Sequence, residues 1–100
     1  MKNYDHITKM ESIMVWYEKA IKDLEALLDT MEAHQEDYTS LMEYYYSDQR
    51  NQDLEDDENG LIPQAMHRGV LSEDEIFDLM GDYRDTAIHM MEVALSMIKK

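Results

Sequence analysis

Carboxylates are concentrated between residues 53 and 58, and hard divalent cations prefer carboxylate ligands. The oxygen-bearing residues at positions 55, 57 and 59, followed by Gly60, match the start of a calcium-binding EF-hand loop. The bidentate glutamate that ends such a loop is replaced by Met66, which argues against an EF-hand. Two alternatives remain for this region. It is an acidic loop that is simply solvated by water, or it is a looser cation site whose weak candidate ligands are Asp53, Asp56, Asp57 and Glu58.

A second group of residues combines tyrosines with an isolated arginine. Tyr45 and Tyr46 belong to a run of three tyrosines, and Arg68 is one of only two basic residues between residues 23 and 82. A cation with so few like neighbours is expected to pair with carboxylates or to stack on an aromatic ring. We therefore predict that these residues anchor a loop to the helices. The alternative is a recognition surface for a peptide or a small ligand.

The sequence offers no pattern for catalysis. It has no cysteine, which excludes disulfides, thiolate chemistry and cysteine-based zinc sites. It also lacks the Glu-x-x-His motif of di-metal helical bundles, the Gly-x-Ser-x-Gly motif and a glycine-rich phosphate loop. We expect a non-enzymatic protein without a cofactor.

The first half of the chain has the seven-residue period of a long amphipathic helix. From Ile7 to Tyr45, eleven of the twelve heptad a and d positions are apolar or aromatic, and g positions widen the stripe. Neither glycine nor proline interrupts residues 5–46, so the pattern predicts one helix of about 63 Å. The one polar a residue, Gln35, marks residues 34–37 as the place for a kink, or for a break into two helices.

Residues 47–72 are predicted as a long acidic loop, because they contain the only proline, two of the three glycines and the turn signal Asn59-Gly60. A loop of that length tends to be functional or to contain a short helix. A second helix is predicted over residues 73–98. It begins with a capping box, in which the Ser72 hydroxyl accepts from the Glu75 amide and the Glu75 carboxylate reaches back to residue 72.

These elements predict an all-α fold and a single helical domain over residues 1–100. The arrangement is a long antiparallel helical hairpin or, with a broken first helix, a three-helix bundle, each with the long acidic loop. The returning helix, about 39 Å long, covers only part of an unbroken first helix. The remaining apolar stripe requires a partner, so we expect a homodimer that associates through the heptad face.

Charge and hydropathy restrict the possible partners. The net charge of −14 repels nucleic acid and anionic membranes, so we expect neither as a partner. No apolar run approaches the ~20 residues of a membrane span, and the N-terminus lacks the apolar core of a signal peptide, which favours a cytoplasmic location. Residues 23–59 hold 13 acidic residues and one basic residue, so an acidic surface for a basic protein is a third, less favoured hypothesis.

One family resemblance supports this interpretation. The Tyr45-Tyr46-Ser47 corner and the string Arg68-Gly69-Val70-Leu71-Ser72-Glu73-Asp74 resemble a family of small bacterial proteins classed as domain of unknown function 4298. The similarity extends over nearly the whole chain. It implies a bacterial, cytoplasmic protein and transfers no catalytic residue. The leading expectation is a helical interaction protein; the alternative is a small divalent-cation-binding protein that uses the acidic loop.

Overall fold

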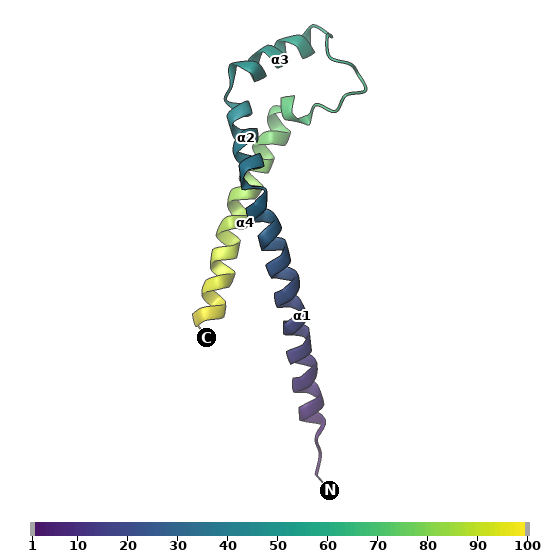
Figure 1. The fold of residues 1–100 in the computed structure, drawn as a ribbon, viewed down its shortest axis with the longest axis vertical. Helices are drawn as coiled ribbons and strands as arrows, with labels where there is room; N and C mark the ends of the chain where they lie inside the picture. Colours follow the sequence, from purple (N-terminus) through teal and green to yellow (C-terminus); the bar gives the residue numbers. More distant parts are fainter. Residues whose placement is uncertain (1, 100) are drawn as a thin grey trace. The chain divides into compact units, whose positions relative to one another are not determined.

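The computed structural model describes residues 2–99, over which the chain forms helices and no strand (Figure 1). The predicted all-α class is therefore confirmed. The chain divides into two units, residues 1–42 and residues 43–100. Its elements in order are α1 (Asp5–Ala33), α2 (Gln35–Tyr45), α3 (Asp48–Glu58), the 3-10 turn η1 (Gly69–Leu71) and α4 (Glu73–Lys99).

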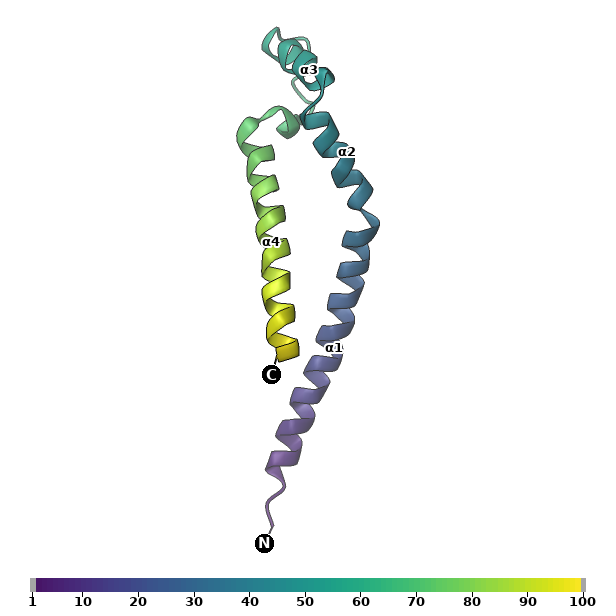
Figure 2. The same ribbon diagram turned by 90° about the vertical axis from the view of Figure 1, so that its left-hand side faces the viewer.

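The long N-terminal helix is interrupted once, at His34, inside the region that the sequence marked for a kink. Backbone hydrogen bonds bridge the interruption, because the His34 amide donates to the carbonyls of Thr30 and Met31. The imidazole Nδ1 lies 2.9 Å from the Thr30 carbonyl oxygen, so the side chain competes with the backbone at this turn. The ribbons of α1 and α2 continue in one direction with a bend (Figure 1 and Figure 2).

The apolar face of α1 is exposed in the single chain. We call nine of its large apolar a, d and g residues the α1 seam, and each has 41–61% of its surface exposed, whereas Leu28, at a further a position, is partly buried. The expectation that these side chains are hidden against other helices is thus not met by one chain alone. The α1 seam consists of Ile7, Met10, Ile13, Met14, Tyr17, Ile21, Leu24, Leu27 and Met31.

The prediction of a continuous loop from 47 to 72 is wrong over residues 48–58, which form α3. Ser47 is the N-cap of this helix, since its Oγ accepts from the Arg50 amide at 3.2 Å. The same hydroxyl donates to the Tyr44 carbonyl at 2.6 Å. The helix was missed because Leu54 is its only aliphatic residue, so no hydrophobic period announces it.

The Asn59-Gly60 signal ends α3 instead of forming an independent turn. The Gly60 amide donates to the Asp57 carbonyl, and the Leu61 amide donates to the Asp56 carbonyl. This pair of bonds is a Schellman motif, which requires a left-handed residue after the helix. Gly60 provides that conformation with φ of 71°.

Within the described residues, only Ile76 and Arg50 are buried, and both lie in the second unit. Ile76 is 3% exposed in the first turn of α4, and Arg50 is on α3. The best-packed region is therefore the junction of α3, η1 and α4, where the loop returns to the helix.

Candidate functional site

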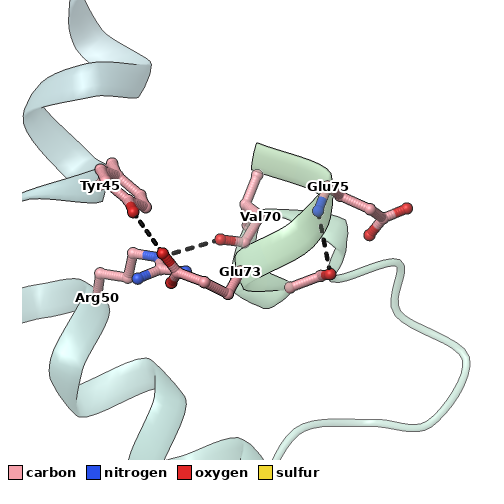
Figure 3. A network of polar contacts seen from close by, with 6 residues as sticks. Tyr45, Arg50, Val70, Glu73 and Glu75 are labelled. Atoms are coloured by element: carbon pink, nitrogen blue, oxygen red, sulfur yellow. Dashed lines mark hydrogen bonds and ion pairs between the residues drawn. The ribbon is translucent and has the colours of Figure 1, made fainter. Parts of the chain in front are cut away.

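A buried arginine joins α2, α3, η1 and α4 (Figure 3). The Nε of Arg50 donates to the Val70 carbonyl oxygen at 3.1 Å, and the guanidinium lies 4.7 Å from the centre of the Tyr45 ring. Its Nη2 is 3.6 Å from a carboxylate oxygen of Glu73. We call Tyr45, Arg50, Val70 and Glu73 the arginine junction. It connects four elements through one residue that is only 5% exposed.

The polar groups of the arginine junction are unequally satisfied. The Tyr45 hydroxyl donates to Glu73 at 2.6 Å, and this hydrogen bond, followed by burial, raises the pKa of Tyr45. The Nη2 of Arg50 is buried without a hydrogen-bond partner, because Glu73 lies beyond hydrogen-bonding distance. Since the Glu73 side chain is 67% exposed, the ion pair is weak, and the aromatic ring and the Val70 carbonyl hold the guanidinium more firmly.

A second hydrogen-bonded group joins α2 to α3. The Tyr44 hydroxyl donates to one oxygen of Asp53 at 2.6 Å, and the Gln49 amide donates to the other at 2.8 Å. Burial, followed by the hydrogen bond to Asp53, raises the pKa of Tyr44. The hydrogen bonds from Tyr44 and Gln49 lower the pKa of Asp53, which therefore stays anionic.

Arg68 organises the irregular segment between α3 and η1. Its Nε is 2.7 Å from a carboxylate oxygen of Asp57, at the end of α3. One Nη donates to the carbonyl oxygens of Pro63 and Met66 at 3.3 and 3.1 Å. A single guanidinium thus ties the segment both to itself and to α3, which is the kind of contact that a loop-anchoring role requires.

This segment, η1, the end of α2 and the middle of α3 border an open hollow of about 320 Å³. Its wall is mostly apolar, with the Tyr44–Asp53 pair on one side and Arg68 on another. We call it the loop hollow. It is lined by Tyr44, Asp53, Leu61, Ile62, Pro63, Met66, His67, Arg68, Val70 and Leu71.

The four candidate metal ligands are placed in helix α3, where they serve separate partners. Asp53 and Asp57 accept from Tyr44 and Arg68 as described, while Asp56 accepts from Gln52 at 3.0 Å, and Glu58 is exposed. Glu55 and Asp57 are two positions apart in helix α3 and therefore point to opposite sides of it, so this segment does not form the ligand loop of an EF-hand, in agreement with the absence of the final glutamate. Over residues 2–99, no group of three or more such side chains is arranged to hold a metal ion.

The remaining predicted site residues lie around the arginine junction. Tyr46 is 74% exposed and packs edge-on against Tyr45, with ring centres 4.8 Å apart. The Ser72 hydroxyl accepts from the Glu75 amide at 3.3 Å, as the capping box requires. The second half of the box does not form as predicted, because the Ser72 amide donates to the Gly69 carbonyl within η1. The Glu75 carboxylate instead lies against Gly69, where a Cβ would approach within 2.7 Å.

Sequence reasoning missed the central residues of the arginine junction. Arg50 entered the sequence analysis only as the single basic residue of the acidic range 23–59, and Glu73 entered it only as part of the string that resembles the family. The isolation of Arg50 was the available signal, since it applies to Arg50 as strongly as to Arg68. The sequence analysis also did not single out Tyr44, which the structure pairs with Asp53.

Comparisons with known proteins agree with the resemblance seen in the sequence. Among the described residues, no helix has the length and apolar character needed to cross a membrane. No curated protein and no solved structure matches the chain significantly. The family model described as Domain of unknown function (DUF4298) matches residues 7–93, from the start of α1 into the last turns of α4. The chain therefore belongs to the DUF4298 family, whose function is unknown.

Proposed function

We propose that this chain is a non-enzymatic helical interaction protein that forms a homodimer through the α1 seam. One observation carries the proposal: nine large apolar side chains on one face of α1 each have 41–61% of their surface exposed. Their seven-residue period is the pattern by which helices pack side by side. A contiguous exposed apolar surface of this kind is typical of a protein–protein interface.

The energetics favour a partner for this face. Moving each of the nine residues from about half exposed to buried contributes about 1 kcal/mol, or on the order of 10 kcal/mol for each chain. Association costs about 4–15 kcal/mol in lost translational and rotational freedom. Two copies that bury the α1 seam together therefore gain enough to form a stable dimer.

Charge sets the salt dependence of the dimer. Each copy carries a net charge of −14, and a row of glutamates borders the α1 seam: Glu11, Glu18, Glu25 and Glu32. Like charges repel across a symmetric interface, and added salt screens that repulsion. Self-association is thus expected to strengthen as the salt concentration rises.

Light scattering on a size-exclusion column tests the proposal with matched charge changes. Met14→Glu with Ile21→Glu places two carboxylates in the α1 seam, and we expect it to convert the dimer into a monomer. Ser12→Glu with Ala26→Glu adds the same charge on the opposite face of α1 and is expected to leave the dimer intact. Equal masses for the two variants would contradict the assignment of the interface to the α1 seam.

The proposal also places the protein in the bacterial cytoplasm, as the family resemblance implied. The cation-binding alternative is tested by titration with calcium, magnesium and manganese, described with the predictions below.

A further inference from the structure

The loop hollow is a second binding feature, separate from the α1 seam. Its volume of about 320 Å³ is at the small end of the range for ligand sites, and it suits one large side chain better than a cofactor. Its apolar wall is open to solvent, since Leu61, Met66 and Val70 are 70%, 55% and 42% exposed. Exposed apolar walls around a concave surface gain free energy when another apolar group covers them.

The walls of the loop hollow are held in place by internal contacts. Arg68 connects the carbonyls of Pro63 and Met66 to Asp57, and the Tyr44–Asp53 hydrogen bond fixes the opposite side. A ligand would therefore meet a preformed surface and would not have to order the loop on binding. Preorganisation of this kind increases affinity by reducing the entropy lost on association.

The part of the chain that forms the loop hollow carries a large net negative charge. Residues 43–75 contain two basic side chains, Arg50 and Arg68, and each is paired with a carboxylate of the same chain. No other cation offsets the acidic residues of this range, so the outward field attracts positive charge. The acidic residues are Glu43, Asp48, Asp53, Glu55, Asp56, Asp57, Glu58, Glu73, Asp74 and Glu75.

We propose that the loop hollow binds a basic peptide segment of another protein by taking up one of its large apolar side chains. The apolar wall takes the anchor residue, and the net negative charge of residues 43–75 attracts the lysines and arginines beside the anchor. Asp53 can take part directly, because a carboxylate offers about four acceptor positions and the contacts described above use two. A basic peptide suits the loop hollow better than a second copy of this chain does, since only the peptide carries charge opposite to that of residues 43–75.

Fluorescence anisotropy with labelled peptides tests this proposal. The probe is the fluorescein-labelled peptide Lys-Lys-Arg-Leu-Lys-Arg-Lys, and a matched peptide has glycine in place of leucine. The full-length chain is expected to bind the leucine peptide about tenfold more tightly, as burial of one leucine side chain implies. Binding of both peptides should weaken with added salt, opposite to the salt dependence of self-association, so the two proposals can fail separately.

Two uncharged double variants separate the loop hollow from the general negative field. Leu61→Asn with Met66→Gln makes the wall polar at exposed positions, and it should remove the tenfold preference for the leucine peptide. Gln64→Asn with Ala65→Ser changes neighbouring residues that do not line the hollow, and it should keep that preference. The proposal is overturned by equal affinity for the two peptides, by a preference that survives in the first variant, or by no binding of either peptide at millimolar concentration.

Discussion

Replacing Arg50 by alanine tests whether the arginine junction stabilises the second unit. The charged hydrogen bond to the Val70 carbonyl contributes about 1.5–3 kcal/mol, and stacking on the Tyr45 ring away from water contributes about 1–2 kcal/mol. The ion pair with the exposed Glu73 adds less than about 1 kcal/mol. In the opposite direction, the substitution removes the buried Nη2, which has no hydrogen-bond partner, and this stabilises the folded chain by about 1–2 kcal/mol. The net expectation is a loss of about 3 kcal/mol in the free energy of unfolding.

Urea unfolding followed by circular dichroism at 222 nm measures this loss, and thermal unfolding should show a fall in Tm of at least ~10 °C. Arg84→Ala is the matched control, because Arg84 is exposed on α4 and its loss should change stability by less than about 0.5 kcal/mol. If Arg50→Ala and Arg84→Ala unfold at the same urea concentration, the arginine junction does not hold the second unit together.

Gly60→Ala should lower the free energy of unfolding by about 1 kcal/mol, because φ of 71° strains a residue with a Cβ. Gly81→Ala should raise it by about 0.5–1 kcal/mol, since alanine favours helix and no atom obstructs the new Cβ. Arg68→Ala should lower the free energy of unfolding by about 1–2 kcal/mol, because it releases two carbonyls and Asp57. The pKa values of Tyr44 and Tyr45 are raised in the folded chain, so their contribution to stability is fully present below pH 10 and is lost as the pH rises through the folded-state pKa values. The urea concentration at the unfolding midpoint should therefore decrease when the pH is raised beyond 10, and this decrease should be smaller in Tyr44→Phe. Calorimetric titration with calcium, magnesium or manganese should give no heat of binding, and thermal unfolding with each ion present should give an unchanged Tm.

Each of these expectations would be contradicted by a specific experimental outcome. A Gly60→Ala chain as stable as the unmodified one would mean that α3 does not end in the Schellman motif. Unchanged stability in Arg68→Ala would favour a recognition role for that residue over loop anchoring. A urea midpoint that is flat between pH 8 and pH 11.5 would rule out the hydrogen bonds assigned to the two tyrosines. A saturable heat of binding in the calcium titration would favour the alternative that the carboxylates of α3 bind a divalent cation.

The long helices were predictable because their apolar residues repeat with the period of a helix. The heptad pattern gives α1 and α2 almost in full, and the region around Gln35 correctly marks the interruption, which falls one residue earlier at His34. The Ser72 cap predicts the start of α4 in the same way, because capping depends on local hydrogen bonds that the sequence specifies directly.

Helix α3 and the arginine junction were not predictable by the same reasoning. α3 has almost no apolar residues, so only its caps identify it, and both Ser47 and Asn59-Gly60 also suit turns. The partners of Arg50 lie 5, 20 and 23 positions away, at Tyr45, Val70 and Glu73, and such pairings depend on the path of the chain. Patterns of local spacing contain no information about contacts of that kind.

Sedimentation equilibrium of the unmodified chain between about 1 and 100 µM tests whether two copies associate, because it measures the assembled mass without a label or a substitution. The proposed homodimer predicts twice the chain mass of 11.9 kDa, with a dissociation constant that falls as the salt concentration rises. A helical chain that sediments at 11.9 kDa at every concentration and at high salt would contradict self-association through the α1 seam.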